Sequence, residues 1–489
     1  MTDHMSRRET LKGLALGAGT LLAAGTARAV AAEANRPVAG SATAAPRALR
    51  SVLTARDGGQ RLAAQGPLQP AAAEPDLPSL WVDTASRFQT LLGFGGAFTE
   101  AAAITWLKLS PARREEVLRA YFADGDGHGY GMCRVHMNSC DFALGNYAHV
   151  ERAGDTALAS FSIARDRQAL IPFIKAAQRV AKHPIRILAS PWSPPGWMKS
   201  NGEMNHGGTL LPRYRQAWAR CYVKFIQAYA AEGIPIWGVS VQNEPAAVQS
   251  WDSCIYTAEA ERDFVRDHLG PELAAAGLGD VKIIIWDHNR DLMVERANIV
   301  YADAAAAHYV WGTGFHWYGE DDFDHVQQVH DAWPEKHLLF TEGCQEGGPH
   351  LGSWDLGERY ARSMINDLNR WTEGWMDWNL VLDKQGGPNH VGNYCSAPII
   401  LDTEQDALLP QSSYYYLGHF ARFIKPGAQR VLCAASLQAL ETTAFVNPDG
   451  TVAVVAMNRT DKAQRFALRV DGGHWVAELP PHSIASYLS

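Results

Sequence analysis

The sequence lacks the motifs that mark several large classes of enzyme. Its seven cysteines include no Cys-x-x-Cys pair, which disfavours zinc-ribbon sites and thioredoxin-like chemistry. There is no His-Glu-x-x-His spacing and no Gly-x-Ser-x-Gly elbow, so the signals of a zinc protease and of a serine hydrolase are both missing. The net charge of −8 argues against nucleic acid, because phosphate binding needs a basic surface. We therefore expect no metal, no cofactor and no nucleic acid partner.

Long apolar runs are also scarce, and the one candidate lies at the N-terminus. Ser6–Lys12 resembles a twin-arginine export signal, and the apolar run that follows it is too short and too rich in glycine for a membrane span. We predict a signal peptide over residues 1–31 and a flexible leader, rich in Ala, Pro and Thr, over residues 32–46. The mature chain should have no transmembrane segment and should be exported, either periplasmic or secreted.

Residues 93–425 alternate short apolar segments with amphipathic helical ones. Eight strands alternating with helices predict a (β/α)8 TIM barrel, the catalytic domain of an α/β protein. A doubly wound open sheet is the alternative, but no glycine-rich dinucleotide turn opens its first helix. The expected strands are Leu91–Ala97, Gly131–His136, Ile185–Ser190, Trp237–Val241, Val281–Trp286, Gly312–His316, Leu338–Thr341 and Gly374–Trp378.

The segments on either side of the predicted barrel have the pattern of β structure. Residues 47–92 contain short strands broken by prolines and cannot bury a core alone. Residues 426–489 alternate apolar and polar side chains, with turns at Asn447–Gly450 and Asp471–Gly473. We predict that the two segments form one β-sandwich side domain, which would bring the ends of the mature chain together.

Two of the predicted barrel strands run directly into a glutamate. Ile236–Val241 is followed by Gln242-Asn243-Glu244-Pro245, and Leu338–Thr341 is followed by Glu342. Proline pushes the preceding residue towards extended backbone, so Glu244 is expected at the carboxyl end of its strand. Barrel active sites lie at that end, so the two carboxylates should meet there, as acid–base hydrolysis of a glycosidic bond requires.

Other predicted strand ends supply polar and aromatic side chains. Polar groups can bind the hydroxyls of a sugar, while indole rings cover its C–H faces, so this mixture suits a polyhydroxylated ligand. The side chains of interest are Arg134, Asp141, Trp192, His316, Tyr318 and Trp378.

With these motifs in place, the chain resembles glycoside hydrolase family 30, and in particular its glucosylceramidase-like branch of lysosomal-type acid β-glucosidases and their bacterial relatives. The resemblance runs from Gly93 to the C-terminus. Its most specific segments are Gly93–Thr99, Ser139–Phe142, Ala189–Trp192, Gln242–Pro245, His316–Tyr318, Leu351–Asp355 and Gly374–Leu380.

The resemblance implies a retaining enzyme that cleaves β-glucosidic bonds by double displacement. By motif position, Glu244 is the acid/base and Glu342 the nucleophile, and Arg134 supports the nucleophile. We expect Glu244 to be protonated and Glu342 to be ionised in the free enzyme. The residues that fall where the family holds the glucose are Asp141, Trp192, Asn243, Trp378 and Asn393.

The group on the other side of the cleaved bond is left open. His136 and Asp287-His288-Asn289 depart from the lysosomal type and are similar to the β-1,6-glucanase branch of the family. The expected substrate is a β-glucoside, either a glucolipid or a β-glucan oligosaccharide. Endo-β-1,6-glucanase and β-xylosidase activity are the alternatives within the family. A carbohydrate-binding protein without turnover is the alternative of another class, and the presence of both Glu244 and Glu342 disfavours it.

Overall fold

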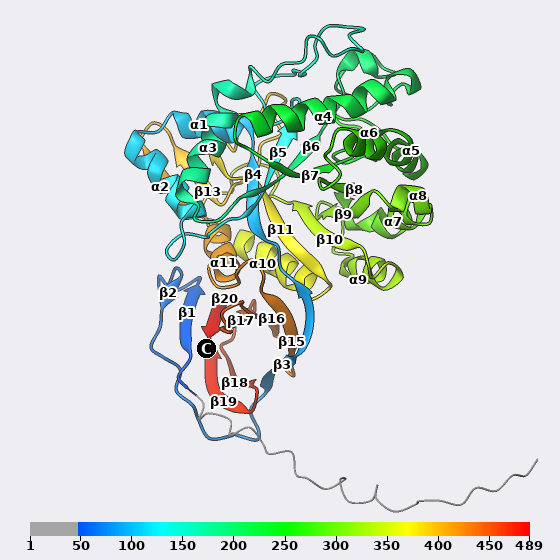
Figure 1. Ribbon diagram of the computed structural model, residues 1–489. Coiled ribbons are helices and arrows are strands. Elements are labelled where there is room, and N and C mark those ends of the chain that lie inside the picture. The colour runs from blue at the N-terminus through cyan, green and yellow to red at the C-terminus, as the bar shows by residue number, and fades with distance from the viewer. Residues whose placement is uncertain (1–46) are drawn as a thin grey trace, which may run out of the picture. The chain divides into compact units, whose positions relative to one another are not determined.

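The computed structural model describes residues 47–489, and the predicted signal peptide and leader lie outside the described residues. Its centre is a closed barrel of parallel strands in the order β4-β5-β6-β7-β8-β9-β10-β11, with β11 pairing back to β4 (Figure 1). The predicted (β/α)8 barrel is confirmed. The strands are β4 (Gly93–Phe98), β5 (Met132–Met137), β6 (Arg186–Pro191), β7 (Ile236–Ser240), β8 (Lys282–Asn289), β9 (Val310–His316), β10 (His337–Glu342) and β11 (Thr372–Asn379).

Side chains fill the inside of the barrel, so it is a packed core and not a channel. Met132, Leu188, Ile284, Leu339 and Met376 form one buried cluster there, each contributed by a different strand. Ligands are therefore confined to the loops at one rim of the barrel.

Helices cover the outside of the barrel. The first begins after Thr99, whose side chain accepts a hydrogen bond from the Ala102 amide, and the second has Ser110 as N-cap and Pro111 at its first position. No helix within residues 47–489 is long and apolar enough to cross a membrane. The helices are α1 (Glu100–Leu107), α2 (Pro111–Phe122), α3 (Leu170–Val180), α4 (Arg215–Ala231), α5 (Ala258–Phe264), α6 (Gly270–Ala275), α7 (Met293–Tyr301), α8 (Ala304–Ala307), α9 (Phe323–Ala332), α10 (Asp355–Leu368) and α11 (Ser412–Ala421).

The two flanking segments of the chain share one nine-stranded sheet, in the order β19-β18-β3-β15-β16-β17-β20-β1-β2. Leu80, Val454, Phe466 and Tyr487 lie in its buried core. The predicted side domain of N-terminal and C-terminal segments is therefore confirmed, although β15 and β19 were not expected. The strands are β1 (Arg50–Ala55), β2 (Ala63–Ala64), β3 (Ser79–Thr90), β15 (Gln429–Ala435), β16 (Leu440–Val446), β17 (Val452–Asn458), β18 (Gln464–Val470), β19 (Gly473–Leu479) and β20 (Ser483–Leu488).

A small sheet that the sequence did not predict follows the last barrel strand. It consists of β12 (Val381–Asp383), β13 (Ile399–Asp402) and β14 (Ala407–Pro410), with β13 in the middle. Its strands are too short to show a clear period of two. The segment between β12 and β13 carries Asn389, Asn393 and Cys395.

Polar contacts tie the side domain to α11. The ring of His419 on α11 lies between the hydroxyls of Thr54 on β1 and Ser486 on β20, at 2.9 Å from each. Burial lowers the pKa of His419 to about 3, so the imidazole is neutral and one nitrogen donates while the other accepts.

Candidate active site

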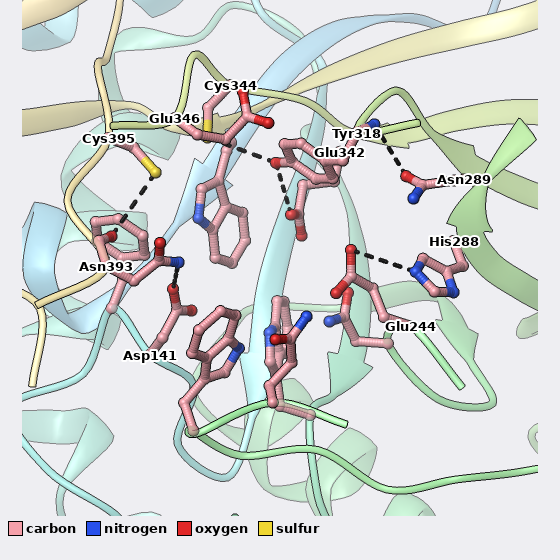
Figure 2. Close-up of a pocket in the computed structure, with 16 residues that line it drawn as sticks. Asp141, Glu244, His288, Asn289, Tyr318, Glu342, Cys344, Glu346, Asn393 and Cys395 are labelled. Atoms are coloured by element: carbon pink, nitrogen blue, oxygen red, sulfur yellow. Dashed lines mark hydrogen bonds and ion pairs between the residues drawn. The ribbon is translucent and has the colours of Figure 1, made fainter. Parts of the chain in front are cut away.

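A cavity of about 320 Å³ opens where the carboxyl ends of the barrel strands meet their loops (Figure 2). This volume is near the lower limit for small-molecule sites and suits one sugar ring better than a long chain. The lining side chains are Asp141, Phe142, Trp192, Asn243, Glu244, Gln249, Trp251, His288, Asn289, Tyr318, Glu342, Cys344, Glu346, Trp378, Asn393 and Cys395.

Glu244 and Glu342 face each other across this cavity (Figure 2). Three atoms lie within 4.8 Å of one another here: one carboxylate oxygen of Glu244, one carboxylate oxygen of Glu342 and a ring nitrogen of His316. Glu342 is the last residue of β10, as expected. Glu244 lies four residues beyond the end of β7, in the following loop.

The expectation of extended backbone at Glu244 is wrong. Its φ is +48°, in the left-handed region that residues other than glycine rarely adopt. The Glu244 amide donates to the Asp287 carbonyl at 3.0 Å, and the Asn243 amide donates to the Pro191 carbonyl at 2.8 Å. These bonds to two neighbouring strand ends outweigh the local preference of a residue before proline. Asp287 has a φ of +52°, so the backbone is strained on both sides of the contact.

Arg134 binds two carboxylates from beneath the cavity. Its guanidinium donates from Nη1 to Glu342 Oε2 and from Nη2 to Asp287 Oδ2, both at 2.6 Å. Nη2 also donates to Asn243 Oδ1 at 2.9 Å, and Nε donates to Ser190 Oγ at 3.0 Å. The Arg134 side chain is fully buried, so its bonds to the nucleophile candidate are shielded from solvent on the arginine side.

His316 joins the other glutamate to the same network. Its Nδ1 lies 3.3 Å from Glu244 Oε1, and its Nε2 lies 2.9 Å from Asp287 Oδ1. The ring is fully buried and does not line the cavity. The sequence grouped His316 with the substrate-binding residues; in the structure its side-chain contacts are with Glu244 and Asp287.

The charges of this network place a proton on His316. Burial lowers the pKa of His316, but Glu342, Asp287 and Glu244 outweigh it and raise the pKa to about 9. Burial likewise raises the pKa of Glu244, but His288 and His316 reverse the shift and hold it below the usual value. At neutral pH these shifts favour an imidazolium at His316, 3.3 Å from a Glu244 carboxylate whose pKa is lowered, whereas the sequence predicted a protonated Glu244.

Glu342 has a second hydrogen-bond donor besides Arg134. The Tyr318 hydroxyl donates to Glu342 Oε1 at 2.9 Å, so both carboxylate oxygens are held. Burial and the nearby Glu244 raise the pKa of Glu342, while His316, Arg134 and Tyr318 oppose the rise. A carboxylate oriented by two donors and aimed into a cavity is well placed to attack an electrophilic carbon.

The opposite wall of the cavity combines an acid with two indoles. Asp141 Oδ2 accepts hydrogen bonds from Asn393 at 3.0 Å and Asn389 at 3.1 Å. Burial raises the pKa of Asp141 to about 7, against these two bonds. The rings of Trp192 and Trp378 stack with centroids 5.0 Å apart. A buried carboxyl beside aromatic faces is an arrangement suited to binding sugar hydroxyls and C–H groups.

Most of the residues named from the sequence converge on this cavity. Those that line it are Asp141, Trp192, Asn243, Glu244, Tyr318, Glu342, Trp378 and Asn393. Arg134 and His316 lie behind the two glutamates. The sequence analysis did not assign His288, although it follows a predicted strand end, or the loop residues Gln249 and Trp251, for which no motif gives a signal.

Comparison with known proteins gives one consistent result. The family model described as the glycosyl hydrolase family 30 TIM-barrel domain matches residues 91–424, and the family 30 beta sandwich domain matches residues 427–487. The mouse lysosomal acid glucosylceramidase is 39% identical over 423 residues, which are 82% of this chain and 81% of that protein.

Two solved structures give the same picture. That of SrfJ from Salmonella typhimurium superposes with a TM-score of 0.86 at 36% identity, covering 90% of this chain and 99% of that one. The endo-β1,6-glucanase BT3312 superposes with a TM-score of 0.81 at 30% identity, with the same coverage of both chains.

Proposed function

Because the chain belongs to glycosyl hydrolase family 30, and is therefore a glycoside hydrolase acting on a glycoside substrate, we propose that it is a retaining β-glucosidase of the glucosylceramidase type. The observation that carries this proposal is the pair of carboxylates, Glu244 and Glu342, with oxygens within 4.8 Å of each other. Retaining glycosidases hold their two carboxyl groups about 5–5.5 Å apart, whereas inverting enzymes leave about 6.5–9.5 Å for a water molecule. The short separation supports double displacement.

In the first step, Glu342 attacks the anomeric carbon and the glycosidic bond breaks. Arg134 and Tyr318 orient the attacking carboxylate through their bonds to its two oxygens. The departing oxygen takes a proton from Glu244, which in turn receives the proton stored on His316. The product of this step is a glucosyl ester of Glu342.

In the second step, Glu244 acts as a base. A water molecule attacks the anomeric carbon, its proton passes to Glu244, and the ester bond to Glu342 breaks. The proton can return to His316, which Asp287 holds in position by accepting from Nε2 at 2.9 Å. Two inversions at the same carbon give net retention of configuration.

Specificity for glucose is supported by the relatives and by the polar wall of the cavity. The mouse relative is named as a glucosylceramidase. Asp141 and Asn393 offer a carboxyl and an amide to sugar hydroxyls, and Trp378 offers a ring face. A buried polar group that loses its partner keeps the cost of desolvation, so such a wall discriminates strongly between sugars.

Exposed apolar side chains support an apolar group on the other side of the cleaved bond. Seven large hydrophobic side chains are exposed within residues 47–489, and five of these lie in segments that follow barrel strands, although none of the five lines the cavity. Exposed apolar side chains near a site would suit a lipid chain better than a second sugar. The five are Leu144, Val248, Leu292, Leu351 and Tyr394.

A second candidate is an endo-β-1,6-glucanase. It is favoured by the similarity to the β1,6-glucanase BT3312 and by His136 and Asp287-His288-Asn289, which depart from the lysosomal type. Product analysis on glucosylceramide, β-1,6-glucan and nitrophenyl β-glucoside in parallel separates the two. Release of ceramide with no oligosaccharides from glucan is the expected outcome.

Export is part of the proposal. The twin-arginine-like Ser6–Lys12 and the apolar run after it support a signal peptide and a periplasmic or secreted enzyme. The test is N-terminal sequencing of the protein from the periplasm and medium of an expressing bacterium, with Arg7→Lys/Arg8→Lys as control. An uncleaved protein that stays in the cytoplasm would contradict export.

Removing each glutamate tests the two roles. Glu244→Ala should lose activity on alkyl glucosides, by about 10²–10⁴-fold, but should still form the covalent intermediate with a dinitrophenyl glucoside, whose leaving group needs no proton. Azide should then restore turnover and give β-glucosyl azide. Glu342→Ala should be inactive on both substrates. If Glu342→Ala gave β-glucosyl azide and Glu244→Ala gave the α-anomer, the assignment would be reversed.

A further inference from the structure

Two thiols share one wall of the catalytic cavity. Cys344 follows Glu342 by two residues, and Cys395 lies in the segment between β12 and β13. Both line the cavity, and Figure 2 shows their sulfur atoms on the same side of it. A backbone bridge between Glu346 and Cys395 brings the two segments together, and the Ser396 amide donates to the Gln345 carbonyl at 2.8 Å.

Each thiol contacts a residue that is itself hydrogen-bonded to a group of the proposed reaction or to one that binds the sugar. The Tyr318 hydroxyl, which donates to Glu342, lies 3.5 Å from Cys344 Sγ. Cys395 Sγ donates to the Asn393 carbonyl at 3.8 Å, and the Asn393 amide donates to Asp141. A change at the two sulfurs therefore reaches the nucleophile on one side and the sugar-binding wall on the other.

The remaining cysteines are different in their surroundings. All seven are free thiols, but among them only Cys344 and Cys395 line the cavity. Cys140 belongs to the same buried apolar cluster as Cys344 and Cys395 but does not line the cavity. The other four pack in other clusters, as small apolar side chains do, and they are Cys133, Cys221, Cys254 and Cys433.

We propose that Cys344 and Cys395 form a dithiol modification site, which reacts with low-molecular-weight disulfides to give a Cys344–Cys395 disulfide and so stops hydrolysis. In the first exchange, the Cys395 sulfur attacks the reagent RSSR, forming a mixed disulfide and releasing RS⁻. In the second, the Cys344 sulfur attacks the Cys395 sulfur and releases the other RS⁻. The two thiol protons leave with the two RS⁻ groups, so the cysteines are oxidised by two electrons and RSSR is reduced to two RSH.

The order of attack follows from the environments of the two sulfurs. Burial and the neighbouring Cys395 raise the pKa of the Cys344 thiol well above its usual value, which makes Cys344 a poor first nucleophile. Once Cys395 carries the mixed disulfide, the neighbouring Cys344 sulfur attacks it and forms the Cys344–Cys395 disulfide. A disulfide needs an S–S distance of about 2.05 Å, so closure displaces both sulfurs, one of which contacts the Tyr318 hydroxyl and the other the Asn393 carbonyl.

Mass spectrometry tests the chemistry without any substrate. The reduced full-length protein is incubated with oxidised glutathione and digested under non-reducing conditions. We expect a peptide that joins Cys344 to Cys395, with the loss of two hydrogen atoms, and its disappearance after dithiothreitol. If glutathione adds but no joined peptide forms, or if neither thiol reacts, the proposal is wrong.

Activity tests the consequence, and this part rests on the proposed β-glucosidase function. The rate of hydrolysis of dinitrophenyl β-glucoside should fall in proportion to the fraction of protein that carries the Cys344–Cys395 disulfide. When all of the protein carries it, the rate should be about 100-fold lower, because small displacements of catalytic groups are costly. Dithiothreitol should restore it. The hydrolysis rate of each glutathione-treated variant is compared with that of the same variant in its reduced form. Cys395→Ser should resist inactivation by glutathione, and Cys433→Ser, a control in the side domain, should remain as sensitive as the parent.

The two possible failures are distinguishable. If the joined peptide forms but the activity is unchanged, or if Cys395→Ser is inactivated as fast as the parent, the thiol pair does not control hydrolysis. If the reduced parent hydrolyses no β-glucoside at all, the proposed function is wrong, while the joined peptide still tests the dithiol site.

Discussion

Replacing Arg134 by methionine should destabilise the protein more than an ordinary core substitution. The guanidinium is fully buried and lies 2.6 Å from both Glu342 and Asp287. Methionine leaves two buried carboxylates without their cation. Removing one partner of a buried ion pair costs about 3–5 kcal/mol, so we expect a loss near the upper end of that range in the free energy of unfolding.

The loss in the free energy of unfolding should be larger at neutral pH than at acidic pH. Burial raises the pKa of Asp287, but Arg134 and His316 reverse this and hold it below its usual value. Asp287 therefore contributes stability above the pKa of an unfolded aspartate, about 3.9, and this contribution disappears as the pH falls through the lower folded pKa. Most of this contribution of Asp287 to the stability is absent in the Arg134→Met variant. The difference between the parent and the variant should be largest near neutral pH and should begin to shrink as the pH falls below about 4.

Urea unfolding followed by tryptophan fluorescence, at several pH values between about 7 and 3.5, measures this difference. Asp287→Asn and the double variant Arg134→Met/Asp287→Asn complete a cycle. The double variant should lose less than the sum of the two single losses, because each single change strands the other charge. A cost for Arg134→Met under about 1 kcal/mol, or costs that add within about 0.5 kcal/mol, would refute the reasoning.

Three further outcomes are expected from the same geometry. Proton NMR of early hydrolysis should show β-glucose as the first product, and α-glucose would exclude Glu342 as the nucleophile. Asp141→Ala should lower kcat/KM by about 100-fold or more with little change in melting temperature, and a small loss would mean that Asp141 does not bind a sugar hydroxyl. Because the pKa of His316 is raised to about 9, kcat/KM for alkyl glucosides should fall as the pH rises through that value. The His316→Gln variant should not show this fall in kcat/KM at high pH. An unchanged fall would show that the proton comes from another group.

Much of the fold could be predicted from the sequence because the signals are local. Each barrel strand is a short apolar run, and the alternation with helices fixes the barrel. The family that the motifs resemble is also confirmed by the family models. The strand β15 was missed for a physical reason. β15 exposes Leu432 and has bulges where it pairs with β3, so its sequence does not alternate cleanly.

The arrangement within the site depended on contacts that no local pattern contains. The left-handed backbone of Glu244 is imposed by a hydrogen bond to Asp287, which belongs to another strand. The charge of His316 depends on three carboxylates from three separate segments, namely Glu244, Asp287 and Glu342. The sequence therefore named the candidate reacting groups, but the pKa shifts that their contacts produce depend on the three-dimensional structure.

The strand order of the side domain has a consequence for how this protein is made. The last strand, β20, lies between β17 and β1, so Arg50 pairs with Leu488 at opposite ends of the described chain. During synthesis β1 must wait, with one edge unpaired, until β20 has left the ribosome. An unpaired strand edge is a template for association with other chains. The nascent barrel can assemble earlier, because its neighbouring strands are mostly neighbours in sequence. Translation stopped before β20 would release a chain in which β1 has lost its main partner.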